Sequence, residues 1–300
     1  MITRRNFIKQ SALAATAIGL SAHSSWAFGN AKGITGIQLY SVRDDMKTDA
    51  LGTLKKLAAM GYQYVEHANY VNRKFYGHSP ADFKKILSDM GMKMPSGHTV
   101  LGKNHWDEAK KDFTDSWKYT VEDAATAGQQ YVVSPWLDAS LYETEDKLKH
   151  FMDVFNKCGE LCNKHGMKFG YHNHDFEFSK KVNGKVLYDL ILGLTDPKVV
   201  IQQLDTGNLF NGGVKAMDII KKFPGRFEMM HVKDEIAASG GHEKYESTVL
   251  GKGIAQVKDV IDIGASEGTK LFIIEQEAYQ GVAPIECAKE NYEIMKKWGY

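Results

Sequence analysis

The chain has 300 residues, of which 43% are hydrophobic, 25% charged and 11% aromatic. This composition excludes a disordered, collagen-like or long coiled-coil chain, and the length allows one large domain or two ordinary ones. The 38 basic and 37 acidic side chains give a net charge of +1, without the basic stripe typical of nucleic-acid-binding proteins. After residue 30 there is no apolar run long enough for a transmembrane helix.

Residues 1–27 have the organisation of a secretory signal peptide. The pair Arg4-Arg5 precedes a mildly apolar stretch at 11–20, and small residues at 25 and 27 match an A-x-A-like cleavage site. The segment is similar to twin-arginine signals, which export folded proteins across the bacterial inner membrane, so we expect a periplasmic protein. A surface helix with two arginines by chance is the alternative. Removing 1–27 takes away three basic side chains and no acidic one, which changes the net charge from +1 to −2.

Only three cysteines are present, at positions 158, 162 and 287. Cys158 and Cys162 share one face of a predicted helix, where buried structural thiols are expected. An odd number excludes full pairing, so the sequence predicts neither a disulfide framework nor a cysteine-rich metal site.

Short apolar runs alternate with amphipathic stretches eight times from Ile34 onward. The predicted strands are 35–40, 62–66, 93–98, 130–134, 168–172, 199–205, 227–233 and 270–275. The predicted helices are 50–60, 81–90, 107–127, 144–165, 186–194, 214–223, 255–266 and 284–297. Four glycines lie just past a predicted helix, where a left-handed cap residue is favoured: Gly61, Gly91, Gly128 and Gly166.

Eight βα units predict a protein of the α/β class, a single (β/α)8 TIM barrel over residues 28–300 with its active site at the C-terminal strand ends. A doubly wound open sheet has the same alternation of strands and helices. Such a sheet usually has a glycine-rich turn after its first strand, but residues 41–45 here read SVRDD.

Ionisable residues end several of the predicted strands: Glu66, His98, His172 with His174, Asp205, His231 with Lys233, and Glu275. Because the strands of a barrel converge at one mouth, these side chains are expected to lie close together. Clustered carboxylates repel one another unless a cation neutralises them. Oxygen ligands with imidazoles suit Mn²⁺, Mg²⁺, Co²⁺ or Zn²⁺, so the order Asp, His, Glu on strands six to eight predicts a divalent metal site.

Several of these residues also have a purely structural interpretation. His98 can be a hydrogen-bonded core residue, and Asp205 can cap the helix that follows it. Lys233 can form an ion pair with Glu275 or Glu277. Trp136, which follows the fourth strand, can pack in the core rather than stack on a sugar.

Six segments resemble the xylose-isomerase-like TIM-barrel superfamily, specifically its sugar phosphate isomerase/epimerase branch, over roughly residues 34–300: GIQLYSVRDDM, GYQYVEHA, FGYHNHDFEF, QLDTGN, MMHVKD and FIIEQE. The resemblance implies one divalent ion, Mn²⁺ first with Co²⁺, Mg²⁺ or Zn²⁺ as alternatives. Its ligands in the family are Glu, Asp, His and Glu from strands five to eight. Asp205, His231 and Glu275 match the last three.

The fifth strand departs from the family pattern, because His172-Asn173-His174 stands where many relatives have a glutamate followed by Asn-His. We expect Glu177 to turn back and supply the fourth ligand, with His174 as the alternative.

The resemblance implies an isomerase or epimerase that removes a proton next to a sugar carbonyl. Candidate proton-transferring groups are Glu275 and Glu177, and otherwise His98 and His174. The expected substrate contacts are Glu66, His172, Asn208, Lys233 and Trp136. Because sugar phosphates are cytoplasmic, an exported member is expected to use a free sugar, an oxidised (keto) sugar or a glycoside.

Other functions are compatible with the same barrel. Losing a β-oxygen instead of returning the proton gives a keto-glycoside lyase or hydratase, or an inosose-type dehydratase. A DNA-repair nuclease of the endonuclease IV type uses three zinc ions and a histidine where this chain has Asn208, and the charge of −2 also opposes nucleic-acid binding. A sugar-binding barrel without catalysis is the non-enzyme alternative. We expect a small-molecule sugar partner, no nucleic acid, no membrane after signal removal, and a homodimer as one possible assembly.

Overall fold

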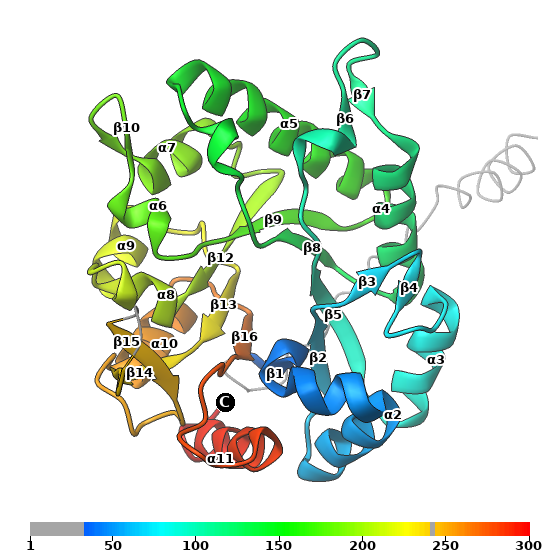
Figure 1. Ribbon diagram of the computed structural model, residues 1–300, viewed down its shortest axis with the longest axis vertical. Helices are drawn as coiled ribbons and strands as arrows, with labels where there is room; N and C mark the ends of the chain where they lie inside the picture. Colours follow the sequence, from blue (N-terminus) through cyan, green and yellow to red (C-terminus); the bar gives the residue numbers. More distant parts are fainter. Residues whose placement is uncertain (1–32, 241–243) are drawn as a thin grey trace, which may run out of the picture.

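The structure is a computed structural model that describes residues 33–240 and 244–300. Eight parallel strands close into a barrel in the order β1-β16-β13-β12-β9-β8-β5-β2, and helices surround it (Figure 1). The strands are β1 (Ile34–Gln38), β2 (Tyr64–His67), β5 (Lys93–His98), β8 (Tyr131–Ser134), β9 (Lys168–His172), β12 (Val200–Asp205), β13 (Met229–Val232) and β16 (Leu271–Ile274). The predicted α/β class and single (β/α)8 barrel are therefore confirmed. The predicted signal peptide at 1–27 lies outside the described residues.

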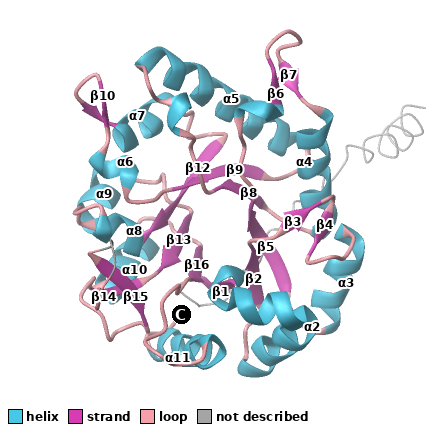
Figure 2. Ribbon diagram, in the orientation of Figure 1, coloured by secondary structure: helices cyan, strands magenta, loops and turns pink. Residues whose placement is uncertain are grey.

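The outer ring consists of helices that follow the strands (Figure 2). They are α2 (Arg43–Met60), α3 (Pro80–Asp89), α4 (Asp115–Ala127), α5 (Glu145–Lys164), α6 (Phe176–Ser179), α7 (Leu187–Leu194), α8 (Thr206–Asn211), α9 (Ala216–Lys222), α10 (Val257–Ser266) and α11 (Pro284–Lys297). The four predicted cap glycines have positive φ angles of 72° to 108°, which confirms the expected helix ends. No helix within 33–240 and 244–300 is long and apolar enough to cross a bilayer.

Short hairpins extend from the barrel: β3–β4 (Tyr70–Val71, Lys74–Phe75), β6–β7 (Trp106–Asp107, Asp112–Phe113), β10–β11 (Lys181–Val182, Lys185–Val186) and β14–β15 (Asp234–Ala237, Tyr245–Thr248). One of them corrects the sequence analysis, because the helix predicted at 107–127 begins only at Asp115. The rings of Trp106 and Phe113 pack 5.1 Å apart and hold the hairpin, so the charged residues between them form a turn.

Alternation along the strands places an apolar layer below a polar one inside the barrel. Side chains two apart share a face. On β13, Met229 lies in the apolar interior cluster, while His231, two residues on, is polar and fully buried. Likewise Ile201 is followed by Gln203, and Ile273 by Glu275. The barrel floor is thus a packed core, and its C-terminal end carries the ionisable groups.

The three cysteines all lie in the described part of the chain and are free and buried. The indole Nε1 of Trp117 donates to the Cys158 Sγ at 3.2 Å, so this thiol is part of the packing between α4 and α5.

Candidate active site

Four buried side chains converge at the C-terminal end of the barrel. His172, Asp205, His231 and Glu275 each offer a ligand atom, and these atoms all lie within 4.8 Å of one another. They come from β9, β12, β13 and the end of β16, which are neighbours around the barrel. Two imidazoles and two carboxylates at this spacing form a donor set that suits a divalent cation.

Asp205 fits both interpretations made from the sequence. Its Oδ1 accepts a hydrogen bond from the Asn208 backbone N–H at 2.6 Å and so caps α8. Its Oδ2 is buried and accepts no hydrogen bond from any described residue, although the Lys233 Nζ lies 3.3 Å away. Burial raises the pKa of Asp205 to about 6. An orphaned, buried carboxylate oxygen inside a His/Asp/Glu cluster fits a metal ligand.

His231 lies between two carboxylates. Its Nδ1 is 3.1 Å from the Glu275 Oε2 and its Nε2 is 2.5 Å from the Glu66 Oε1. Burial alone would lower the pKa of His231, but Glu66 and Glu275 outweigh it and raise it to about 10. Burial would raise the pKa of Glu275, yet Lys233 and His231 hold it well below its usual range. A positive charge between the Glu66 and Glu275 carboxylates is therefore strongly favoured.

Lys233 forms the ion pairs anticipated from the sequence. Its buried Nζ lies 2.9 Å from the Glu275 Oε2 and 2.6 Å from the Glu277 Oε1. Gly207 leaves room for this lysine, because a Cβ at position 207 would lie 2.6 Å from the Lys233 Cδ and 2.4 Å from the Glu235 Oε1. The ammonium group is thus held at the edge of the cluster, where it can also attract a substrate oxygen.

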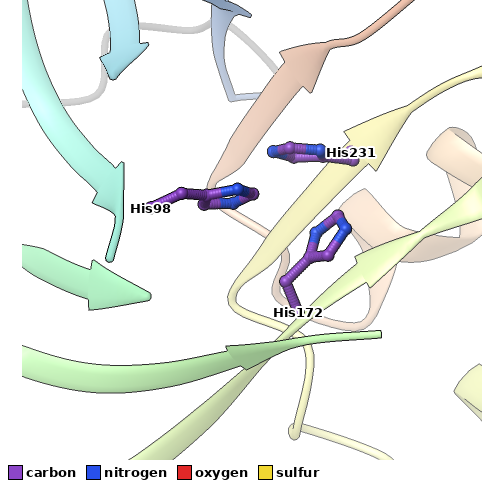
Figure 3. Close-up of side chains that lie close together, drawn as sticks. All are labelled: His98, His172 and His231. Carbon is purple, nitrogen blue, oxygen red and sulfur yellow. The ribbon is translucent and has the colours of Figure 1, made fainter. Parts of the chain in front are cut away.

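Glu66 lies on the opposite side of His231 from Glu275, and the His98 ring stacks on the His231 ring. The rings of His98, His172 and His231 face one another, with centroids 4.6 to 5.0 Å apart (Figure 3). The His98 Nε2 is 2.7 Å from the Gln203 Oε1 and 3.1 Å from the Glu66 Oε1. His98 is therefore both hydrogen-bonded and part of the site.

Three polar residues of this network were missed in the sequence: Gln38, Ser96 and Gln203. A usable signal existed, because Gln203 precedes Asp205 by two, and Ser96 precedes His98 by two, so each pair shares a strand face. Within the strands, only ionisable residues were considered as site candidates, so these two amides and this hydroxyl were not predicted.

Glu177, expected to be the fourth ligand, is not among the converging side chains. The Tyr171 hydroxyl donates to its Oε1, and the His174 backbone N–H donates to its Oε2 at 2.9 Å. Tyr171 packs in the helix-facing cluster, whereas His172, the next residue, faces the barrel interior. His172, and not Glu177, therefore lies beside Asp205, His231 and Glu275 in the structure. Burial raises the pKa of Glu177 to about 7.

His174 and Trp136 lie further out at the mouth. Burial, with a smaller effect of Lys233, lowers the pKa of His174 to about 4, and its Nδ1 has no hydrogen-bond partner among the described residues. The Trp136 indole is 47% exposed, and its ring lies 5.2 Å from the rings of both His174 and Phe176. The Asn208 side-chain amide donates to the Asn173 carbonyl at 3.1 Å, while its Oδ1 lies 3.5 Å from the Lys233 Nζ.

The glycine-rich loop after β15 directs backbone N–H groups at the carboxylate of Asp234, which belongs to the chain itself. The Asp234 Oδ2 accepts from Gly251 and Gly253 at 2.8 and 3.0 Å, and its Oδ1 accepts from Ala255 at 3.2 Å. The N–H groups that a phosphate would use are therefore already occupied.

The comparisons with known proteins agree with this barrel fold. A family profile described as "Xylose isomerase-like TIM barrel" matches residues 54–298. The chain belongs to this family. An inosose dehydratase of Clostridium perfringens is 30% identical over 241 residues, which cover 71% of this chain and 80% of that protein. An inosose dehydratase of Clostridium botulinum is 24% identical over 269 residues, 81% of this chain and 88% of that protein.

Solved structures show the same fold. A sugar phosphate isomerase/epimerase from Parabacteroides distasonis has a TM-score of 0.76 at 26% identity, with 89% of this chain and 100% of that chain covered. The IOLI protein, described with a bound zinc atom, has a TM-score of 0.67 at 15% identity and covers 88% of this chain and 99% of its own. Membership of this family of xylose isomerase-like barrels, expected from the sequence, is confirmed.

Proposed function

We propose that this protein is a divalent-metal-dependent enzyme that removes a proton next to the carbonyl of a free or oxidised sugar. One observation carries the proposal: four buried potential ligands converge at the barrel mouth, and the Asp205 Oδ2 among them accepts no hydrogen bond from any described residue. A sugar-binding barrel without chemistry would not need a buried, ionised cluster, which is costly to maintain.

His172, Asp205, His231 and Glu275 would hold the metal ion. The ion, when bound, supplies Lewis acidity that stabilises negative charge developing on substrate oxygens. His172 replaces the family's glutamate in this set. Two imidazoles favour borderline ions such as Zn²⁺ and Co²⁺, and also accept Mn²⁺, in preference to Mg²⁺. The zinc described for the IOLI protein is consistent with such a choice.

Two groups are placed to take the substrate proton. Glu275 is held ionised by Lys233 and His231, which keep its pKa low, and His174 has an unpartnered Nδ1 beside the cluster. Returning the proton to the neighbouring carbon gives isomerisation, whereas expelling a β-hydroxyl as water, with the abstracted proton balancing the hydroxide, gives dehydration. Both need only one base, while epimerisation needs a second group on the opposite face. The relatives are named inosose dehydratases, so dehydration is the outcome we favour over epimerisation.

The substrate we propose carries no phosphate. Asp234 already occupies the amides of Gly251 and Gly253 in the glycine-rich loop after β15, so these amides are not free to bind a phosphate. Export through residues 1–27, which remains a proposal, favours the same conclusion, because free and oxidised sugars occur outside the cytoplasm.

Proton exchange in heavy water tests this function. Metal-loaded protein is incubated with keto-hexoses and with cyclic keto-polyols of the inosose type, and deuterium incorporation and water loss are followed by NMR. We expect exchange or elimination with at least one of them, and none with Asp205→Asn. The matched control Asp218→Asn changes an exposed aspartate on α9 and should behave as wild type. Metal-loaded protein that exchanges no carbon-bound proton in any keto compound would refute the proposal.

A second candidate, a keto-glycoside lyase, is favoured by the aromatic surface at the mouth. Trp136 packs against His174 and Phe176, and the Phe176 ring stacks 6.0 Å from that of Tyr142. An exposed indole beside the site can stack on the leaving group of a glycoside, which a free monosaccharide lacks. Trp136→Ala should then lower kcat/KM for a keto-glycoside by about tenfold and leave the free keto sugar unchanged. Equal effects on both substrates would remove this candidate.

A further inference from the structure

Glu66 is the most highly connected side chain of the site, although it is not among the four potential ligands. It is fully buried on β2. Its partners come from four other strands: Gln38 Nε2 at 2.8 Å, Ser96 Oγ at 2.5 Å, Gln203 Nε2 at 2.8 Å, His231 Nε2 at 2.5 Å and His98 Nε2 at 3.1 Å. The sequence analysis expected a substrate contact at this position, but both carboxylate oxygens are already used inside the protein.

The contact with His231 determines which of its nitrogens is free. An ionised carboxylate can only accept hydrogen bonds, so the His231 Nε2, 2.5 Å from the Glu66 Oε1, must carry a proton. The other nitrogen, Nδ1, faces the Glu275 Oε2 at 3.1 Å and the Asp205 Oδ2 at 3.7 Å. Without a metal, the Glu275 carboxylate likewise requires a proton on Nδ1; a bound metal ion would take the place of this proton, and the Nδ1 lone pair would then point into the ligand cluster. A carboxylate behind a metal-binding histidine commonly has this role.

Glu66 acts on His172 through the Gln203 amide. The Glu66 Oε2 accepts from the Gln203 Nε2, which turns the Gln203 Oε1 toward the two other imidazoles. That carbonyl oxygen lies 3.0 Å from the His172 Nδ1 and 2.7 Å from the His98 Nε2, so both nitrogens must be donors. The His172 proton thus sits on Nδ1. Its Nε2, 3.9 Å from the Asp205 Oδ2, is left with a lone pair facing the cluster.

We infer that Glu66 is a positioning residue that sets opposite tautomers in the two histidine ligands: Nε2–H in His231 directly, and Nδ1–H in His172 through Gln203. Both imidazoles then present a lone pair to the same point. This inference rests on the proposed function, since it assigns these two histidines to the metal site.

The role requires a carboxylate and not merely a polar group. An amide at position 66 has one donor end. If that end faces Gln203, the Gln203 amide must turn over, and the His172 Nδ1 then loses its acceptor. If it faces His231, the His231 proton must move to Nδ1. Either orientation removes one of the two lone pairs from the cluster.

The double variant E66Q/Q203E exchanges the amide and the carboxylate between the two positions. The hydrogen bond between residues 66 and 203 then runs in the opposite direction, and both histidines keep an acceptor. The new amide at position 66 would donate to the new carboxylate at position 203, and its oxygen would still accept from His231. The carboxylate at position 203 would accept from the Nδ1 of His172. A residue needed only for packing would tolerate the isosteric Glu66→Gln change without any rescue. The exchange also restores the negative charge, so the position of the His172 proton, measured in the second experiment, separates the tautomer relay from charge balance.

The first experiment measures the dissociation constant for Zn²⁺ by competition with a chromophoric chelator, with melting temperatures recorded for each variant. Glu66→Gln should weaken Zn²⁺ binding by about 10- to 100-fold, the range typical for such outer carboxylates. The double variant should recover to near the wild-type constant. Glu228→Gln is the matched control: this carboxylate also binds several side chains, Tyr131, Lys168 and Lys270, but precedes β13 at the other end of the barrel. It should leave Zn²⁺ binding unchanged.

The second experiment needs no metal. Long-range ¹H–¹⁵N NMR of metal-free protein with ¹⁵N-labelled histidine reports which nitrogen of His172 carries the proton. We expect Nδ1–H in wild type, Nε2–H or a mixture in Glu66→Gln, and Nδ1–H again in the double variant. Unchanged Zn²⁺ binding and an unchanged His172 tautomer in a folded Glu66→Gln protein would overturn the inference. Wild-type protein that binds no metal would overturn the proposed function instead, while the His172 tautomers would still test the hydrogen-bond relay alone.

Discussion

Replacing Glu177 with glutamine tests whether this residue is a buried structural carboxylate or a metal ligand. Burial raises the pKa of Glu177 from 4.5 to about 7, so the folded state holds its proton more tightly than the unfolded chain does. At about 1.4 kcal/mol per pH unit, ionising Glu177 costs the fold about 3 kcal/mol. This stability is fully present below pH 4.5 and is lost as the pH rises through 7.

Glutamine cannot ionise, yet it can still accept from the His174 N–H and bond to the Tyr171 hydroxyl. Glu177→Gln should therefore unfold in urea with nearly wild-type stability at low pH and be more stable than wild type at high pH, by about 2 to 3 kcal/mol. The exposed Glu122→Gln on α4 is the control and should not alter the pH dependence. Metal content should be unchanged in both variants. A Glu177→Gln protein that folds but no longer retains metal would show that Glu177 is a ligand, against the orientation described above. A wild-type pH dependence that survives the substitution would refute the burial argument.

Three further predictions follow from the site. Asp205→Asn keeps an amide oxygen that can cap α8, so its melting temperature should stay close to that of metal-free wild type while metal retention and turnover are lost; turnover of a confirmed substrate by this variant would contradict the site assignment. Gly207→Ala places a methyl group 2.6 Å from the Lys233 Cδ, so kcat/KM should fall about tenfold or more in steady-state assays with metal still bound, and unchanged kinetics would deny Lys233 a role. Removing the metal with a chelator should lower the melting temperature, because saturation at about 100 times Kd stabilises by about 2.7 kcal/mol; calorimetry showing no shift would exclude tight binding to the folded state.

The barrel could be predicted from the sequence because its signals are local and repeated. Alternation along the strands and a glycine after several helices recur along the chain, and every predicted barrel strand is present within about two residues. The error at 107–127 arose because the segment 108–111, Glu-Ala-Lys-Lys, consists of good helix formers, although Trp106 and Phe113 pair across a hairpin. Such a contact joins residues that no periodic pattern connects.

The convergence of Asp205, His231 and Glu275 could be predicted for the same reason, since they mark the ends of strands that must converge. Glu177 illustrates the limit. The direction of the Glu177 side chain depends on how the chain turns from β9 into α6 and on the hydrogen bond that the Tyr171 hydroxyl donates to it. Neither feature leaves a pattern in the sequence. His172 was expected at the site as a substrate contact, and it lies on the inward face beside Asp205, His231 and Glu275, where we propose that it binds the metal.

Metal content per chain, by elemental analysis of protein purified without chelator, tests the central claim most directly. The account predicts one divalent ion per chain in wild type and none in Asp205→Asn. Protein that holds no ion, even after incubation with Zn²⁺, Co²⁺ or Mn²⁺, would contradict the metal-dependent mechanism, and three zinc ions per chain would point to the nuclease chemistry of related barrels instead.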